Sequence, residues 1–483
     1  MRNETMITLI VALLLNILSG CGSKLPAVTT QGKEISKEVP IAFPGAEGFG
    51  KYATGGRGGK VYVVTNLNDA GEGSLRAGLS SKQPVIIVFA VSGTIHLQSP
   101  LEVRSNTTIA GQSAPGDGIC LADHSVTLKG DNIIIRYMRF RLGDRFQNKG
   151  MVHGGGSDDA LNGMRRKHII IDHCSLSWST DEILSIYAGD STTVQWNIMA
   201  EPLNYSYHFE TGDKDFERHG YGGILGGRHI SIHHNLYAHC QSRTPRFEGN
   251  RNILPEVEFA DYRNNVIYNW AGNNVYGGEG GRYNIVDNYY KSGPNTSKRT
   301  MYQVWLAFKR EDIPFGKFYV NGNYVDGSPD VTSNNWKGVV MDKGTQEDAL
   351  ASKMDAPFPA TSVSTQSPAE AYELVLKSAG ASYKRDTLDQ RIVHEVSTRT
   401  GRIIDVQGGY AHGTAYEISK GAWPVLKSLP AAEDRDKDGM PDEWERKNGL
   451  NPENAADANG RKLHEHYDNI EVYLNNLLQP VTR

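Results

Sequence analysis

The sequence predicts a parallel β-helix, a solenoid of short strands stacked coil upon coil, with a small separate module at its C-terminal end. A pattern of two or three β-forming residues, a polar pair and often an asparagine recurs along residues 132–326, as in a chain of stacked structural repeats. The intervals vary, and in a solenoid this means that loops of different length leave the coils. Asn-Gly and Asp-Gly turns are sparse in this stretch, which disfavours the alternative of a β-sandwich with regular hairpins.

The repeats align on one column that is rich in asparagine. Segments such as IIIDHCSLS, VQWNIM, SIHHNLY and NIVDNYY contribute to it, with steps of 23, 38, 30, 23 and 35 residues along the column. Asparagines at one corner of successive coils can bond side chain to backbone and form a ladder. The column holds Cys174, Asn197, Asn235, Asn265, Asn288 and Asn323.

Two changes in pattern mark the end of the solenoid. The segment SPAEAYELVLKSAGA, from Ser367, has a helical pattern and is expected to pack along the outside of the coils. The segment PAAEDRDKDGMPDEWE, from Pro430, then changes the composition. We therefore expect the β-helix to span residues 41–430 and the C-terminal module to span residues 431–483.

The bulk composition is that of a globular protein without a strong charge of either sign. The chain has 483 residues, of which 39% are hydrophobic and 22% charged, and a formal net charge of −4. This charge gives no field that would attract a polyanion, so nucleic acid binding is not expected. An acidic polymer would have to be held by local arginines, lysines or a metal ion.

The N-terminal residues are expected to be a targeting segment. Arg2 precedes the apolar run ITLIVALLLNIL, which is short for a membrane span and suits a signal peptide over residues 1–20. The run ends in LSGC, which resembles the lipobox of bacterial lipoproteins and implies cleavage before Cys21 and lipidation of its sulfur. Residues 21–40 would then be a tether. We expect an outer-membrane lipoprotein of the cell envelope, on either membrane face, that contacts the membrane only through its lipid; the alternative is an ordinary secreted protein.

The other three cysteines do not indicate a disulfide framework or a zinc site. Cys120, Cys174 and Cys240 are odd in number and lack CxxC spacing. We expect them to be small buried hydrophobic residues.

Several motifs, in the right order, resemble the pectate lyase family (polysaccharide lyase family one). They are NIIIRYMRFRLGD, HIIIDHCSLSWSTDE and GRHISIHHNLYAHCQSRTPRFEG, and the opening AFPGAEGFGKYATGGRGGKVYVVTNLNDAGEGSLRAGL resembles a bacterial branch. The resemblance covers roughly residues 41–430. It implies a right-handed parallel β-helix that cleaves polygalacturonate by β-elimination, usually with Ca²⁺, and releases 4,5-unsaturated oligogalacturonides.

The segment CQSRTPRFEGN carries two arginines around a Thr-Pro. The residues alone allow an ordinary solvated basic pair. The resemblance implies that Arg243 is the base that removes the C5 proton of a uronate, and that Arg246 binds a substrate carboxylate through two parallel hydrogen bonds. An arginine base is demanding, because a reference pKa of about 12.5–13.8 makes its neutral form cost roughly 7–9 kcal/mol at pH 7. Calcium on the substrate carboxylate would help by stabilising the enediolate.

Three acids are the expected ligands of a catalytic calcium ion. Asp159 in SDDAL matches a calcium aspartate of the family, and Asp181 and Glu182 in STDEIL lie where the family has acidic ligands on the next coil. Family members often have further acids at the positions of Ser157 and Ser185. We therefore expect a weaker or rearranged site with Glu182 recruited. The alternative is a set of loop acids without a metal.

The substrate lysine of the family has no evident counterpart. The aligned position is Asn204, which is followed by the insertion YSYHFETGDKDFERHGYGG. The residues of this insertion that could replace the lysine in binding substrate are His208, Lys214, Arg218 and His219.

The C-terminal module contains an EF-hand-like loop. The segment DRDKDGMPDEWE fits the pattern D-x-D-x-D-G-x5-E without a gap, and it resembles the calcium loops of thrombospondin type three repeats and dockerins. We expect it to hold a structural Ca²⁺ with no part in catalysis. The alternative is an acidic loop without metal. The expected ligands are Asp434, Asp436, Asp438, Met440 through its carbonyl, Asp442 and Glu445.

The leading interpretation is thus a monomeric, calcium-dependent lyase that acts on polygalacturonate or pectin. One alternative is a β-helix glycoside hydrolase acting on galacturonan. That chemistry uses two carboxylates that flank the scissile bond, and it has no role for the Arg-x-Pro-Arg motif. Another is a non-catalytic β-helix that binds pectin at the cell surface. It would not need Arg243.

Overall fold

The computed structural model describes residues 39–147, 158–209, 213–251 and 258–478. From Pro40 onward they belong to one compact unit. The predicted signal peptide, Cys21 and nearly all of the predicted tether lie outside the described residues, as does Ser157. No helix in the described ranges is long and apolar enough to cross a membrane.

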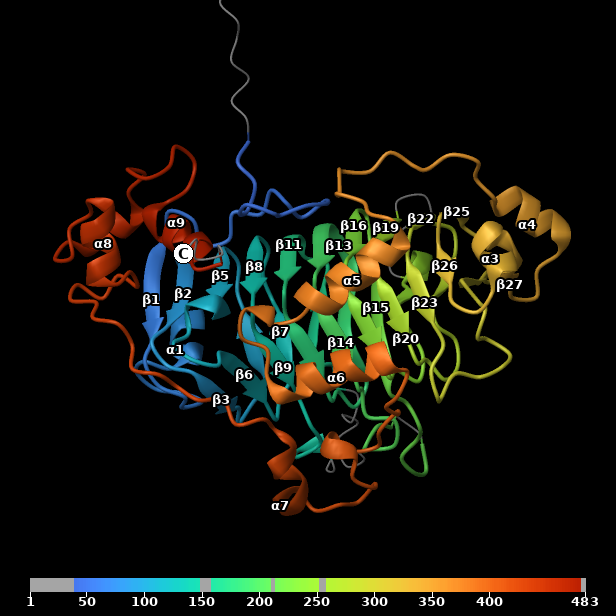
Figure 1. The fold of residues 1–483 in the computed structure, drawn as a ribbon, viewed down its shortest axis with the longest axis horizontal. Helices are drawn as coiled ribbons and strands as arrows, with labels where there is room; N and C mark the ends of the chain where they lie inside the picture. Colours follow the sequence, from blue (N-terminus) through green and yellow to red (C-terminus); the bar gives the residue numbers. More distant parts are fainter. Residues whose placement is uncertain (1–38, 148–157, 210–212, 252–257, 479–483) are drawn as a thin grey trace, which may run out of the picture. The chain divides into compact units, whose positions relative to one another are not determined.

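Three faces of parallel strands wind around a common core, as the sequence pattern predicted (Figure 1). Face A consists of β1 (Lys60–Val64), β2 (Val85–Phe89), β5 (Thr107–Ala110), β8 (Ile133–Arg136), β11 (Lys167–Asp172), β13 (Glu182–Gln195), β16 (Ile230–His233), β19 (Phe259–Arg263), β22 (Arg282–Val286) and β25 (Lys317–Asn321). Face B consists of β3 (Gly93–His96), β6 (Ile119–Ala122), β9 (Arg139–Arg141), β12 (Ser175–Ser177), β14 (Ile198–Ala200), β17 (Leu236–Ala238), β20 (Val266–Tyr268), β23 (Tyr289–Lys291) and β26 (Tyr324–Val325).

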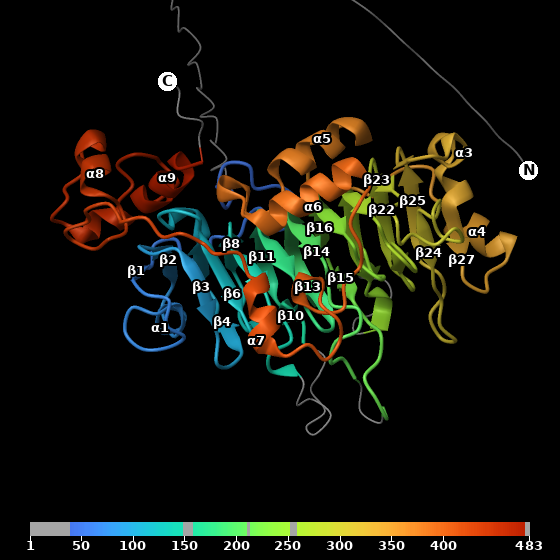
Figure 2. The same cartoon turned by 60° about the horizontal axis from the view of Figure 1, so that its bottom comes forward.

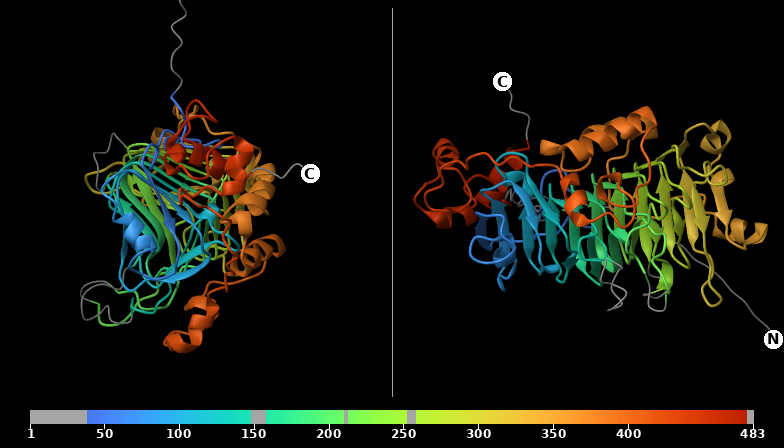
Figure 3. Two further views of the ribbon diagram at one scale, coloured as in Figure 1. Left: turned by 90° about the vertical axis from the view of Figure 1, so that its left-hand side faces the viewer. Right: turned by 90° about the horizontal axis from the view of Figure 1, so that it is seen from below.

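Face C shares one long strand with face A. It consists of β4 (Leu101–Val103), β7 (Val126–Leu128), β10 (Leu161–Met164), the first part of β13, β15 (Tyr221–Gly227), β18 (Arg246–Phe247), β21 (Tyr276–Gly277), β24 (Trp305–Ala307) and β27 (Val339–Met341). Because β13 runs through both faces, they make a single sheet of 18 strands, while face B is a separate sheet of 9 strands. Seen from below, the strands succeed one another along the solenoid in chain order (Figure 3).

The strands form where short apolar runs can be buried on both sides. In β2 the whole segment VIIVF is buried. Ile87 and Phe89 point into the core of the solenoid, whereas Ile86 and Val88 point outward and are covered by the C-terminal segment. Continuous apolar strands of this kind are typical of parallel sheets that are buried on both faces.

The predicted asparagine ladder is confirmed. Asn197 donates its backbone N–H to Asn235 Oδ1 at 2.9 Å, and Asn235 donates its own to Asn265 Oδ1 at 3.0 Å. The ladder continues through Asn288 and Asn323 in the same way. These buried amides satisfy backbone groups at the corner between faces A and B, so they hold successive coils in one register.

Two helices cover face B, as predicted for the segment from Ser367 (Figure 2). They are α5 (Pro368–Ser378) and α6 (Thr387–Thr398), and they bury Val375 and Ile392 against outward residues of face B such as Leu236. Asp386, the N-cap of α6, accepts a hydrogen bond from Arg141 of β9 at 2.5 Å. The pair is buried and fixes where α6 begins on the solenoid.

The remaining helices are short. They are α1 (Leu75–Leu79), α3 (Pro329–Ser333), α4 (Gln346–Ser352), α7 (Tyr416–Ser419), α8 (Asp442–Asn448) and α9 (Asn469–Asn476). Residues of α9 and of the acidic loop before α8 pack against outward-facing residues of β1, β2 and β5. Cys120, Cys174 and Cys240 are buried and form no disulfide, as predicted.

Candidate active site

The candidate site lies at the corner where successive coils enter face C. This corner carries Asp159 shortly before β10, Asp181 directly before β13, Tyr221 at the start of β15, Arg243 shortly before β18 and Tyr276 at the start of β21. Strands β10, β13, β15, β18 and β21 pair consecutively. Because neighbouring strands lie roughly 4.8 Å apart, residues far apart in sequence become neighbours here.

The three predicted calcium acids come together. Asp159, Asp181 and Glu182 each offer a carboxylate oxygen, and these oxygens all lie within 4.8 Å of one another. Asp159 also accepts a hydrogen bond from the backbone N–H of Glu182 at 3.0 Å, which ties the two coils together. Ser185 is buried on β13.

The electrostatics of this cluster suit a cation. Burial, and then the charge of Asp181, raise the pKa of the Asp159 carboxyl well above its usual range. Burial also raises the pKa of Asp158. Carboxylates that are buried and crowded disfavour one another's charged forms, and a divalent cation with oxygen ligands would relieve that repulsion. The residues present therefore fit calcium.

Arg243 reaches this cluster from two coils away. Its guanidinium forms an ion pair with Glu182, lies 4.2 Å from the centre of the Tyr221 ring, and donates from Nε to Tyr276 Oη at 3.1 Å. Its backbone is left-handed, with a φ of 60°. About 22% of the side chain is exposed, so the guanidinium is held firmly yet stays accessible to a substrate.

The two tyrosines were missed from the sequence, although a signal was present. Tyr221 and Tyr276 each open a Tyr-Gly-Gly, one coil on either side of Arg243. A Cβ on Gly222 would lie 2.3 Å from the Arg243 carbonyl oxygen, so glycine is required for the strand to approach the arginine turn. The repeated Tyr-Gly-Gly marks the positions where aromatic rings flank the arginine.

Arg246 lies deeper than its predicted role implies. Its side chain is almost buried, and its Nη2 lies 2.6 Å from Oε1 of Glu279. The guanidinium also lies 5.3 Å from the centre of the Tyr276 ring and 5.5 Å from that of Phe308. Binding of a substrate carboxylate by Arg246 stays a prediction, and it would require access to a guanidinium that already has a buried partner.

The two histidines proposed to replace the family lysine are also buried. His219 Nε2 lies 3.2 Å from Asp181 Oδ1, and the His208 ring stacks on the His219 ring with centroids 3.9 Å apart. Burial lowers the pKa of His219 to about 3, despite the nearby Asp181. His219 is therefore neutral and lies beside Asp181, where it can orient that carboxylate.

The other two candidates are exposed. Lys214 and Arg218 both face solvent, and Arg218 lies over the Tyr205 ring, 3.8 Å from Asp405. Asn204 is buried and donates to Asp405 at 2.8 Å. A cation that contacts an anionic polymer at this position is thus better supplied by Lys214 or Arg218 than by the histidines.

The C-terminal loop gathers some of its predicted ligands but not all. Carboxylate oxygens of Asp434, Asp436 and Asp438 lie within 4.8 Å of one another. Met440 is buried and donates its N–H to Asp438 Oδ1 at 2.9 Å. Asp442 turns away: its Oδ2 lies 3.1 Å from Arg435 Nε and 3.3 Å from Arg446 Nη1.

Comparison with known proteins decides the family. No protein-family model matches the chain. Over 460 residues it is 37% identical to "Probable pectate lyase C" of Aspergillus fumigatus, and the match covers 91% of this chain and 94% of that protein. The chain belongs to the pectate lyase family.

Two further relatives also have pectate lyase names. "Probable pectate lyase C" of Aspergillus oryzae is 36% identical over 455 residues and is covered to 94%. "Probable pectate lyase 5" of Arabidopsis thaliana is 30% identical over 253 residues, which is 44% of this chain and 60% of that protein. A solved structure, "Pectate lyase bound to hexasaccharide", is 15% identical, with a TM-score of 0.48 over 72% of this chain and 99% of that one.

Membership in the pectate lyase family makes the chain a polysaccharide lyase. It thereby decides against the two alternatives left open by the sequence, the glycoside hydrolase and the non-catalytic pectin-binding protein.

Proposed function

We propose that this pectate lyase cleaves polygalacturonate, the backbone of pectin, by calcium-assisted β-elimination with Arg243 as the base. The observation that carries the proposal is the meeting of Arg243 with the acid cluster of Asp159, Asp181 and Glu182 at one corner of the solenoid. A cluster of acids repels an anionic polymer unless a cation joins them, and Arg243 is the partly exposed cation beside them.

The reaction removes the proton at C5 of a uronate and uses that electron pair to form a C4–C5 double bond. The C4–O bond to the next sugar breaks, and the leaving oxygen takes up a proton. Calcium held by Asp159, Asp181 and Glu182 would supply a Lewis acid for the C6 carboxylate, which carries the developing charge. The protein positions the base against C5.

Three contacts position that base. Tyr276 holds Nε, Tyr221 supports the face of the guanidinium, and Glu182 pairs with Nη1. Glu182 is also a member of the acid cluster, so one carboxylate serves both the base and the cation. Proton removal from carbon is efficient only when the base is fixed at near-attack distance, and this set of contacts fixes Arg243.

The substrate would be held by positive charge around this corner. Lys214 and Arg218 are exposed on the insertion between β14 and β15 and suit contacts to uronate carboxylates along the chain. Arg246 is proposed as a further contact, while His208 and His219 act through Asp181. We propose that the protein works as a monomer, since one chain carries every residue named here.

Two proposals concern parts of the chain away from catalysis. The loop from Asp434 to Glu445 is proposed to bind a structural Ca²⁺. The LSGC segment supports a bacterial lipoprotein anchored through Cys21, at the outer membrane of the cell envelope. Replacing Cys21 by alanine should move the protein from the membrane fraction to the soluble fraction, and an unchanged distribution would argue for simple secretion.

A direct assay on polygalacturonate tests the catalytic proposal. Ultraviolet absorbance of the unsaturated product and the increase in reducing ends are measured together, with calcium or with a chelator. We expect both signals with calcium and neither after chelation. Reducing ends without unsaturated product would indicate hydrolysis, and unsaturated product that persists after exhaustive chelation would overturn the calcium assignment.

A further inference from the structure

The carboxylate of Glu445 in α8 has no hydrogen-bond partner among the residues that the structure describes. Glu445 is fully buried, and neither of its oxygens has a hydrogen-bond partner in the described part of the chain. A buried carboxylate is strongly unfavourable unless it is paired or ligates a metal. An ionised Glu445 would therefore need a cation beside it.

Three nearby acids also have carboxylate oxygens without a partner in the described ranges. Asp436, Asp438 and Asp457 each have one buried oxygen without a hydrogen-bond partner in the described ranges. Oxygens of Asp438, Glu445 and Asp457 lie within 4.8 Å of one another, and Asp438 is also within that distance of Asp434 and Asp436. Across the described residues, no lysine or arginine forms an ion pair with any of these five acids.

Asp457 comes from outside the loop motif. It lies in the short 3-10 helix η9 (Ala455–Asn459). The backbone N–H of Asn451 donates to its Oδ2 at 2.9 Å, and its Oδ1 has no hydrogen-bond partner in the described ranges. One carboxylate oxygen of Asp457 lies within 4.8 Å of oxygens of Glu445 and Asp438. Asp442, the acid that the motif predicted, is instead occupied by Arg435 and Arg446.

We propose that Asp457, in place of Asp442, completes a cation site with Asp434, Asp436, Asp438 and Glu445, and that the bound cation fastens the C-terminal segment to the first coils of the solenoid. The site is independent of the proposed catalytic centre. Its donors are carboxylate oxygens from two separate parts of the segment, so the cation would cross-link the acidic loop to η9.

The donor set selects the cation. Oxygen donors alone, without histidine or cysteine, favour a hard divalent ion. Calcium accepts six to eight oxygens in flexible geometry, whereas magnesium demands a near-ideal octahedron and keeps several waters. Five converging carboxylates suit calcium.

The site is attached directly to the solenoid. Gly439 follows Asp438 with a φ of 90°, and a Cβ there would lie 2.8 Å from Val88 of β2. Met440 is fully buried against Ile86 and Val88. Any change in the loop at Asp438 is thus transmitted to the outer face of β2 without an intervening linker.

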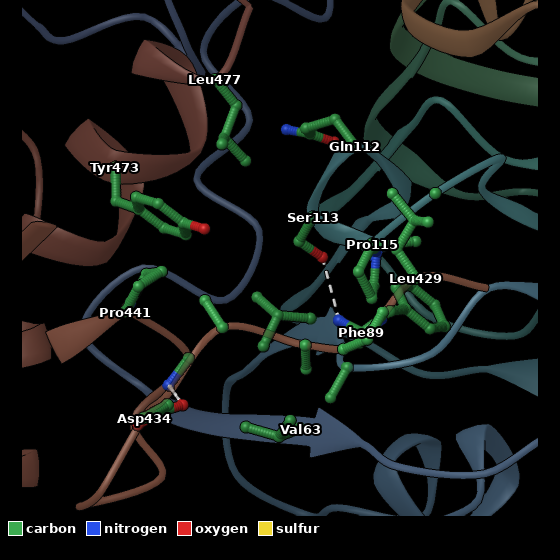
Figure 4. Close-up of a pocket in the computed structure, with 18 of the residues that line it drawn as sticks. Val63, Phe89, Gln112, Ser113, Pro115, Leu429, Asp434, Pro441, Tyr473 and Leu477 are labelled. Atoms are coloured by element: carbon green, nitrogen blue, oxygen red, sulfur yellow. Dashed lines mark hydrogen bonds between the residues drawn. The ribbon is translucent and has the colours of Figure 1, made fainter. Parts of the chain in front are cut away.

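Apolar packing alone does not close this contact. Figure 4 shows a cavity with Asp434 and Pro441 on the side of the loop, Tyr473 on α9, Leu477 directly after α9, and Val63 on the solenoid. Its volume is about 490 Å³. Polar interactions also join the C-terminal segment to the residues before β1. Arg57 Nε lies 2.8 Å from Oε2 of Glu471, and the backbone N–H of Gly58 donates to Asp468 at 2.5 Å. A cation within the loop would keep the loop in the shape that these contacts need.

Thermal unfolding of the full-length protein against calcium concentration tests the proposal, with Asp457→Asn and Asp442→Asn as a matched pair. We expect calcium to raise the melting temperature of the wild type. Asp457→Asn should raise the calcium concentration at half effect by about tenfold or more, because one charged ligand is lost. Asp442→Asn should lower the melting temperature without calcium but leave that concentration within about twofold.

Hydrogen exchange gives a second readout that does not depend on global stability. Peptides that cover β1 and β2 should gain protection on addition of calcium in the wild type and in Asp159→Asn, whose catalytic site is impaired. The gain should be lost in Asp457→Asn. If Asp442→Asn instead of Asp457→Asn shifts the calcium midpoint, or if calcium leaves the melting temperature of the wild type unchanged, the proposed site is wrong.

Discussion

The guanidinium of Arg243 and the carboxylate of Glu182 form an ion pair across two coils of the solenoid, although the residues are 61 positions apart in the sequence. Glu182 belongs at the same time to the acid cluster proposed to bind calcium. The proposed base and the proposed metal site are therefore not separate features. They share one buried carboxylate, and a change at either is expected to be felt at the other.

Arg243→Lys tests the base. Lysine keeps the charge but loses the planar fork and its three contacts, so kcat should fall by about 10²–10⁴-fold with a much smaller change in KM. The wild-type rate should rise with pH above neutrality, because each pH unit removes about 1.4 kcal/mol from the cost of a neutral guanidine. The exposed Arg299→Lys is the control. Near-normal turnover of Arg243→Lys would mean that another group takes the proton.

Tyr276→Phe tests the positioning of the base. The substitution removes the hydroxyl that accepts from Arg243 Nε at 3.1 Å and leaves the ring. Hydrogen bonds to charged groups contribute about 1.5–3 kcal/mol, so kcat should fall by roughly tenfold or more while KM stays within about twofold. Tyr302→Phe, on the exposed surface, should change neither. A purely structural role would appear as a lower melting temperature with unchanged kcat.

Asp159→Asn and Asp181→Asn test the catalytic calcium site. Each substitution removes one charged ligand, so the calcium concentration for half-maximal rate should rise by at least tenfold, since ligand charge sets calcium affinity. Saturating calcium should restore part of the rate. The measurement is kcat against calcium concentration, with the exposed Asp355→Asn as control. An unchanged calcium midpoint in both variants would contradict the assignment.

The contribution of the Asp386 ion pair at the start of α6 to stability should decrease at acid pH. Burial acts to raise the pKa of Asp386, but Arg141 and Arg139 outweigh it and lower the pKa to about 2. Because this value lies below the unfolded reference of about 3.9, the stabilisation is complete above that reference and is lost as pH falls toward 2.

Asp386→Asn keeps a capping side chain at the start of α6 and removes the charge. It should lower the free energy of unfolding by about 3–5 kcal/mol at pH 7, as for other broken buried ion pairs, and the difference from the wild type should shrink as the pH approaches 2. Urea unfolding at several pH values measures it, with the exposed Asp330→Asn as control. A constant difference across pH would show that the charge of Asp386 is not what stabilises the contact.

The solenoid could be predicted because its repeating feature is local. Asn197, Asn235 and Asn265 each sit at the same offset from an apolar strand, so the column is visible in the sequence alone, and the structure confirms the ladder. The acid cluster could be predicted because stacking brings equivalent turns of neighbouring coils together. Both predictions require only that the coils stack.

The rest depended on contacts that no local pattern encodes. Arg246 is covered by Glu279 and Phe308, which come from later coils. His208 and His219 are buried within the insertion between β14 and β15, which lies outside the repeating pattern of the coils. Asp457 lies outside the loop motif, and its carboxylate comes close to those of the acidic loop only in the folded chain. Asp442 forms an ion pair with Arg435, which the motif does not predict.

The asparagine ladder has a consequence for how such a chain can change. Adjacent rungs are joined by hydrogen bonds from a backbone N–H to an asparagine Oδ1, whether the rungs lie 23 or 38 residues apart in the sequence. The number of residues between two rungs can therefore change without shifting the register of the strands. Segments at the face C corner could be exchanged between homologues, or replaced by peptides for display, while the asparagine corner is left untouched. The loops could thus be redesigned without changing the residues of the asparagine ladder.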